Sequence, residues 1–128
     1  MPELISKDIL SQGIKNTDIP RLEEWGKFLA PSDKYDRKAL STSQIRKFFG
    51  EIKRIQAAKF EESKNDIILL DPKIAYAVGR AEHGAKIKDF YKLVSPMLRD
   101  INEDKAKFKN FVNVIESIVA YHKAAGGK

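Results

Sequence analysis

The sequence of 128 residues contains no cysteine and only two histidines, and both shortages exclude kinds of chemistry. Without cysteine, the chain can form no disulfide framework, no thiolate metal site and no cysteine nucleophile. His83 and His122 are too few and too far apart for a recognisable metal motif, so we predict no metal and no other cofactor. No apolar run approaches the roughly 18 residues that a membrane-spanning helix needs, and the first residues carry acids where a signal peptide carries cations. We therefore expect a cytoplasmic protein without membrane contact.

Motifs for catalysis are also missing. The segment GRAEHGAK at residues 79–86 approaches a phosphate-binding P-loop, but its lysine comes one residue late and Ile87 stands where a serine or threonine is needed. No serine nucleophile elbow is present, and no carboxylates cluster on one helix face. These absences favour a binding protein over an enzyme, and a small nuclease ranks behind the two binding hypotheses given below.

Acidic residues are scarce in the later part of the chain. Residues 1–36 hold five cations and seven anions, whereas residues 37–128 hold nineteen cations and eleven anions, which gives the formal net charge of +6. A basic protein attracts polyanions such as nucleic acids. Lysine-rich surfaces also maintain solubility, so the charge alone does not decide between these interpretations.

Apolar residues recur at intervals of three and four along most of the chain, and no convincing alternating strand is present. This spacing predicts an all-α fold, a compact bundle of about five helices in a single domain over residues 1–128. Residues 1–17 hold one small apolar cluster, broken by Gly13, and are expected to form a short N-terminal arm. Residues 18–128 are expected to form the helical bundle.

Capping residues set the expected start of the first two helices. The first begins where the carboxylate of Asp18 caps the following amides and Pro20 occupies the first turn. The second runs from Ser41 or Thr42 to Ser63. Its expected buried side chains are Ile45, Phe48, Phe49, Ile52, Ile55 and Phe60.

Three further helices are expected after a connector over residues 64–72. The third begins where Asp71 caps and Pro72 takes the first helical position, and it ends at Gly84. The fourth carries apolar residues over 87–101 and must kink or open at Pro96. The fifth carries them over 108–122 and ends before residue 126.

The second helix is basic on one side. Its four cations, Arg46, Lys47, Lys53 and Arg54, lie on the side turned away from the apolar residues. Gly50 lies among them, at a cost of roughly 1 kcal/mol relative to alanine, and close approach of a ligand backbone would explain it. A charged helical side is also what solvent exposure alone produces, so both interpretations stay open.

The third helix carries a second group of this kind. Lys73, Tyr76 and Arg80 share one side, and a ring between two cations suits a phosphate backbone with a stacked base. The alternative is a core tyrosine beside a cation that pairs with an acid such as Glu116. Three lysines at the start of the fifth helix, Lys105, Lys107 and Lys109, splay around the axis and are interpreted as solvated.

Three segments resemble a known family in their order and spacing: TSQIRKFFGEIKRI, DPKIAYAVGR and FVNVIESIVAYHKAAGG, within residues 41–127. They are similar to the small subunit of type III-A CRISPR effector complexes, the Csm complex. The resemblance implies an all-α, non-catalytic protein of antiviral defence. It also implies that a few copies associate head-to-tail beside the backbone and large subunits, and contact the duplex of guide RNA and target RNA through phosphates without sequence specificity. Catalysis in such complexes belongs to the other subunits.

The resemblance makes the cations within its first two segments the candidate RNA-binding residues. These are Arg46, Lys47, Lys53, Arg54, Lys73 and Arg80. Tyr121, His122 and Lys123 lie in the third segment. There we expect the residues AYH at 120–122 to lock the last helix into the bundle, with a hydrogen-bonded packing role for His122. The competing hypothesis from another class is a helical protein-protein scaffold with no direct role in nucleic-acid binding.

Overall fold

The computed structural model describes residues 1–126, and these contain helices and loops without a strand. The elements are α1 (Asp8–Gln12), a 3₁₀ turn (Asn16–Asp18), α2 (Ile19–Leu29), α3 (Thr42–Ala57), α4 (Phe60–Arg80), α5 (Ile87–Ile101) and α6 (Lys105–Ala124). The predicted all-α bundle is therefore confirmed, with short α1 in addition to the five long helices. No helix in the described part is long and apolar enough to cross a membrane.

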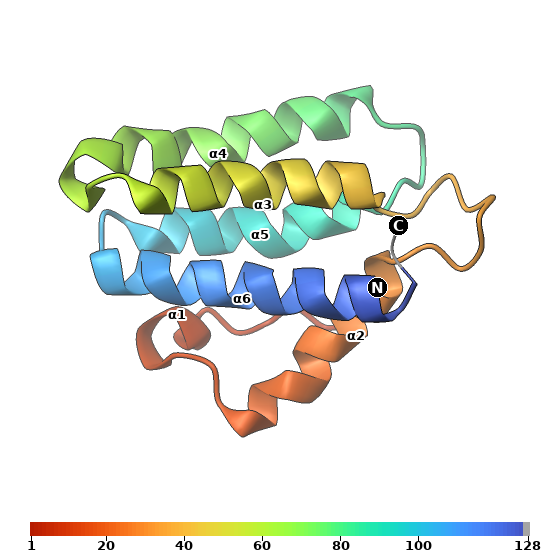
Figure 1. The fold of residues 1–128 in the computed structure, drawn as a ribbon, viewed down its shortest axis with the longest axis horizontal. Helices are drawn as coiled ribbons and strands as arrows, with labels where there is room; N and C mark the ends of the chain where they lie inside the picture. Colours follow the sequence, from red (N-terminus) through yellow and green to blue (C-terminus); the bar gives the residue numbers. More distant parts are fainter. Residues whose placement is uncertain (127–128) are drawn as a thin grey trace.

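Helix α6 occupies the middle of the bundle. Figure 1 shows α3, α4, α5 and α6 running along the long axis, with α1 and α2 on the far side of α6 from α4. Helix α6 contacts α1, α2, α3 and α5, whereas α4 contacts α3 and α5 and forms one edge of the molecule. Among the described residues, no other helix therefore covers the outer side of α4.

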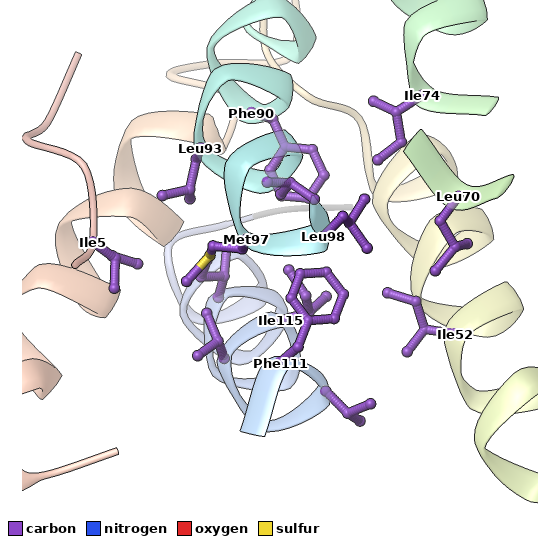
Figure 2. Close-up of a cluster of buried hydrophobic side chains, with 14 of the residues drawn as sticks. Ile5, Ile52, Leu70, Ile74, Phe90, Leu93, Met97, Leu98, Phe111 and Ile115 are labelled. Carbon is purple, nitrogen blue, oxygen red and sulfur yellow. The ribbon is translucent and has the colours of Figure 1, made fainter. Parts of the chain in front are cut away.

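The core is one cluster of apolar side chains from every long helix. Figure 2 shows Phe90, Met97 and Leu98 of α5 near Phe111 and Ile115 of α6, with Ile52 of α3 and Leu70 and Ile74 of α4 closing the cluster. The predicted positions on α3 are confirmed for Ile45, Ile52 and Ile55, which are at most 2% exposed. Phe48, Phe49 and Phe60 are half-buried and pack on the rim of the core.

The N-terminal arm packs onto α2 and α6. Ile5, Ile9 and Leu10 are buried. Trp25 of α2 donates a hydrogen bond from Nε1 to the carbonyl of Glu3 (2.9 Å), and Asn110 of α6 donates from Nδ2 to the carbonyl of Leu10 (2.7 Å). These bonds hold a segment that has little regular structure of its own.

Of the two predicted helix caps, Asp18 and Ser41, the structure confirms only the second. Pro20 lies in the first turn of α2 as predicted, but Asp18 does not cap that helix. Its carboxylate instead accepts the amide of Lys15 (2.8 Å), within the preceding 3₁₀ turn. The start of α3 is confirmed, because Ser41 forms a reciprocal capping box with Gln44.

The predicted end of the second helix at Ser63 is wrong. Helix α3 ends at Ala57, and the chain reverses through the extended residues Ala58 and Lys59 into α4. Ser63 lies in the first turn of α4, where its hydroxyl donates to the carbonyl of Lys59 (2.9 Å). Neither Ala58 nor Lys59 is a strong helix breaker. The turn is therefore set by the packing of α4 against its neighbours and not by the helix propensity of these two residues.

The predicted connector over residues 64–72 is also wrong, because it lies inside α4, which ends at Arg80 before the predicted stop at Gly84. Pro72 does not begin a helix; it sits in the interior of α4 on the exposed side, where water can satisfy the carbonyl left without a donor. Ile67, Leu70 and Ile74 are buried on the opposite side. Burial of these side chains offsets the roughly 3 kcal/mol that an interior proline costs.

The carboxylate of Asp71, predicted to be a cap, joins α4 to α5. It accepts hydrogen bonds from the hydroxyls of Tyr91 and Ser95, both at 2.6 Å, and lies 3.3 Å from Nε of Arg99. Burial raises the pKa of Asp71, but the bonds from Ser95 and Tyr91 and the charge of Arg99 outweigh it, so the pKa lies below its ordinary value.

The last two helices confirm their predicted extent. Helix α5 contains Pro96 on its exposed side, and α6 begins at Lys105, where Asp104 caps the amide of Lys107. His122 is 1% exposed, and its Nε2 lies 2.7 Å from the carbonyl of Leu40. The prediction of a hydrogen-bonded packing histidine is therefore confirmed.

Candidate nucleic-acid interface

The exposed side of α3 carries the four predicted cations. We call the surface formed by Arg46, Lys47, Gly50, Lys53 and Arg54 the basic face of α3; all five residues are exposed. The capping box at Ser41 fixes where the helix begins, and the buried isoleucines fix its rotation. These two constraints turn the cations outward together.

Gly50 has no internal packing role. A Cβ placed at this position would meet no atom within 4 Å, and the residue keeps ordinary helical geometry. Glycine is unfavourable in a helix interior by roughly 1 kcal/mol relative to alanine. Nothing within the described chain therefore requires glycine here, which leaves contact with another molecule as a reason for it.

Glu51 links two of the candidate residues across α3 and α4. Its carboxylate accepts from Nη2 and Nε of Arg54 at 2.8 and 3.1 Å, and from Nζ of Lys73 at 2.8 Å. The bonds from Arg54 and then Lys73 lower the pKa of Glu51 to about 2, so this carboxylate is ionised at neutral pH. Because one anion lies between two cations, the group carries a net charge of +1 instead of +2.

The remaining cations of the basic face are free of acids. Arg46, Lys47 and Lys53 form no ion pair with any residue in 1–126. Lys53 donates to Oε1 of Gln56 (3.1 Å) and lies 5.9 Å from the ring centre of Phe49. Neither contact neutralises its charge, so these three residues give the face its positive potential.

The first turn of α3 adds a shallow hollow beside these cations. It is lined by Thr42, Ser43, Arg46 and Lys47. The positive end of the helix dipole lies here, and helix N-termini favour anions. Oγ1 of Thr42 is buried without a hydrogen-bond partner among the described residues. The end of α3 nearest the hollow is therefore its most electropositive part.

The candidate residues on α4 are arranged differently. Tyr76 is 69% exposed, which makes the core-tyrosine alternative wrong, and the guanidinium of Arg80 lies 5.6 Å from the centre of its ring. The acid beside Lys73 is Glu51, not Glu116. The structure thus brings Arg54 and Lys73 together through Glu51, whereas Arg80 stands at the far end of α4 beside Tyr76.

Two contributors to this interface are only partly visible in the sequence. The Glu51 to Arg54 spacing of three residues in a helix is a recognisable pairing signal, but the contact with Lys73 depends on the packing of α3 against α4. Thr42 and Ser43 at the hollow follow from the capping box at Ser41, which the sequence does show. Within residues 1–126, no group of three or more His, Asp or Glu side chains could hold a metal ion.

Comparison with known families extends the resemblance beyond the three quoted segments. The family model described as Csm2 Type III-A matches residues 17–128, which includes α2 and the loop before α3. Comparisons with curated proteins and with solved structures gave no significant match. A match over nearly the whole chain assigns the family, and all five long helices lie within it. The chain therefore belongs to the Csm2 Type III-A family, the small subunits of the type III-A CRISPR Csm complex.

Proposed function

We propose that this chain is a non-catalytic RNA-binding subunit of its Csm complex, which holds the duplex of guide RNA and target RNA by the phosphates. The observation that carries this proposal is the basic face of α3. Three of its cations pair with no acid among residues 1–126, and they lie around a glycine that no contact within those residues requires. Cations that make no hydrogen bonds to base edges bind the phosphate backbone, and phosphate contacts do not distinguish one RNA sequence from another. The same proposal includes contacts to the backbone and large subunits of the complex, and head-to-tail association of copies of this chain.

We rank the six candidate cations within this proposal by the contacts that each one makes. Arg46, Lys47 and Lys53 come first because none of them pairs with an acid among residues 1–126. Arg54 and Lys73 come second, since a phosphate must displace or share Glu51 to reach them. Arg80 is exposed and forms no ion pair with the part of the chain that the structure describes, but its guanidinium already lies over the ring of Tyr76.

The hollow at the start of α3 supports a phosphate at one end of the face. The exposed Ser43, two cations and the helix N-terminus converge there, and the buried Thr42 completes the lining. A backbone that leaves this hollow can follow α3 past Gly50 to Lys53, where the missing side chain allows a close approach.

The test is replacement of Arg46, Lys47 and Lys53 together by alanine. We expect weaker binding of duplex RNA and weaker incorporation into the guide complex, equally for every RNA sequence. The slope of log affinity against log salt should shrink by roughly 0.7 to 0.9 for each lost phosphate contact. Circular dichroism should be unchanged, because all three positions are exposed.

The matched control replaces Lys92, Lys105 and Lys109, three exposed lysines of α5 and α6 without ion pairs among the described residues. Lys107 is unsuitable because it contacts Asp100. If both triple variants lose RNA affinity equally, the basic face attracts RNA only through the net charge of the protein. Loss in neither would favour the protein-protein scaffold, the competing function.

A further inference from the structure

Two aromatic side chains are exposed, and each has a cation over its ring. Tyr35 is 76% exposed and Tyr76 is 69% exposed, whereas every other aromatic residue in 1–126 is buried or half-buried. Nζ of Lys34 lies 5.1 Å from the centre of the Tyr35 ring. The guanidinium of Arg80 lies 5.6 Å from the centre of the Tyr76 ring. Packing of the bundle accounts for neither ring, so both are open to contact with another molecule.

The loop that carries Tyr35, residues 30–41, is organised by its own acids. The carboxylate of Asp36 accepts hydrogen bonds at 3.1 to 3.2 Å from three backbone amides of the loop, those of Ser32, Lys38 and Ala39. The amide of Tyr35 itself donates to Oδ1 of Asp33 (2.7 Å). These bonds fix the backbone on both sides of the tyrosine, so its ring is presented to solvent by an ordered loop.

The two tyrosines belong to segments that meet at one end of the bundle. Figure 1 shows the loop before α3 and the segment after α4 at this end. Arg37 of the loop lies 3.9 Å from Glu82, and the carbonyl of Lys38 accepts the amide of Lys86 (2.7 Å). Tyr76 lies in the last two turns of α4, which ends beside these contacts. We call this region the tyrosine end of the bundle; it comprises residues 34–38 and the last two turns of α4.

The tyrosine end is positively charged. Three of its cations, Lys34, Lys38 and Arg80, form no ion pair within residues 1–126. Arg37 does pair with an acid, Glu82, but its side chain remains largely exposed. An exposed ring beside a free cation matches the two parts of a nucleotide, because the base stacks on the ring and the phosphate attracts the cation.

We propose that Tyr35 and Tyr76 are stacking platforms for unpaired bases of single-stranded RNA. In a duplex the bases stack on one another and hide their faces, so this ligand differs from the duplex phosphates assigned to the basic face of α3. The inference rests on the proposed RNA-binding function, but it adds a second kind of RNA and different residues. Stacking is tolerant of sequence because every base has a π-face.

The first experiment measures the affinity of the full chain for a labelled single-stranded RNA and for a blunt duplex of the same length. Tyr35→Ala and Tyr76→Ala should each weaken single-strand binding roughly tenfold and leave duplex binding unchanged. Phenylalanine at either position should retain binding and leucine should not, since stacking needs the ring and not merely apolar surface. Ile68→Ala, at a residue of α4 that is 59% exposed, is the matched control and should have no effect.

Salt dependence separates this inference from the proposed function. Loss of a ring removes no phosphate contact, so the slope of log affinity against log salt should stay unchanged, whereas the alanine triple on the basic face of α3 should flatten it. Loss of duplex binding in that triple, with unchanged single-strand binding in both tyrosine variants, would overturn this inference and keep the proposed function. The reverse pattern would keep the stacking site and overturn the role of the basic face.

Photochemical cross-linking tests the contact directly. Single-stranded RNA that carries iodouridine should cross-link on irradiation to the aromatic side chains stacked on it, and mass spectrometry of the peptides should find Tyr35 and Tyr76. Cross-links confined to α3 would overturn the proposal. Tyrosine variants that bind single-stranded RNA normally but fail to enter the Csm complex would assign both rings to another subunit and refute it.

Discussion

Gly26 of α2 lies directly against Tyr121 of α6, with no space for a side chain between the two helices. A Cβ at position 26 would lie 2.8 Å from the backbone nitrogen of His122, closer than real Cβ contacts, and closer still to the Cβ of Tyr121. Glycine therefore sets how closely α2 packs on α6, the helix at the centre of the bundle.

Gly26→Ala should lower the free energy of unfolding by about 1 to 3 kcal/mol, because the helices must separate to admit the methyl group. This is opposite in sign to the usual gain when alanine replaces glycine in a helix. Chemical denaturation monitored by circular dichroism measures the change. A variant as stable as the original protein would show that α2 can shift without cost.

Gly50→Ala should have the opposite effect on stability and raise the free energy of unfolding by up to about 1 kcal/mol, since a Cβ there meets open space. If Gly50 serves close approach of RNA, Gly50→Leu should weaken RNA binding while the fold stays as stable. Ala57→Leu, at an exposed position near the end of α3, is the control for added bulk. RNA binding that is equally strong with leucine at position 50 would refute the role given to this glycine.

The fold was more predictable than the interface, and the reasons are visible in particular residues. The apolar spacing of α5 and α6 predicts both helices because nearly every such residue is buried. Pro72 misled the prediction, since a proline preceded by an aspartate resembles a helix start. Only the packing of Ile67, Leu70 and Ile74 reveals that the helix continues through it.

The candidate interface was predictable as far as local geometry decides it. The outward direction of the α3 cations follows from helical periodicity, and the exposed fractions agree with it. The contact of Lys73 with Glu51 joins residues 22 positions apart on two helices, and no local pattern contains it. The exposure of Tyr76 was likewise not predictable from a local pattern, because it depends on α4 lying at the edge of the bundle.

Glu51→Gln should strengthen RNA binding by the chain, because it frees Arg54 and Lys73 from a shared carboxylate. The salt dependence of binding should also steepen, by roughly 0.7 to 0.9 for each cation that gains a phosphate. Stability should change by less than about 1 kcal/mol, as expected for ion pairs near the surface. Filter binding over a salt series measures both quantities.

The control for this variant is Glu116→Gln, which adds the same unit of charge at an exposed residue of α6 without an ion pair among the described residues. If both variants strengthen RNA binding equally, the effect is one of net charge. A gain confined to Glu51→Gln assigns Arg54 and Lys73 to the RNA surface.

Asp71→Asn should destabilise the protein at neutral pH by about 1 to 3 kcal/mol, since the neutral amide replaces a carboxylate that accepts from Tyr91 and Ser95. The pKa of Asp71 is lowered in the folded protein relative to its ordinary value of 3.8. Its contribution is therefore complete above that ordinary value and is lost as the pH falls through the lower folded pKa. The difference in stability between the two proteins should shrink in acid, which denaturation at pH 7 and in acid would show.

Tyr91→Phe provides the comparison, because it removes one of the two hydroxyl donors and leaves the carboxylate in place. Its destabilisation should be smaller than that of Asp71→Asn. The difference in stability between Asp71→Asn and the original protein could instead stay constant into strong acid. In that case, ionisation of this carboxylate does not stabilise the junction of α4 and α5.

The hydrogen bond from Trp25 to the carbonyl of Glu3 gives the chain a built-in spectroscopic reporter. Trp25 is the only tryptophan, and it is fully buried beneath the N-terminal arm. Detachment of the arm would replace the carbonyl of Glu3 by water and expose the indole, which shifts tryptophan fluorescence toward the red and opens it to soluble quenchers. Emission from this one side chain therefore reports whether the N-terminal arm is packed on α2, without any added label, in the free protein and during assembly.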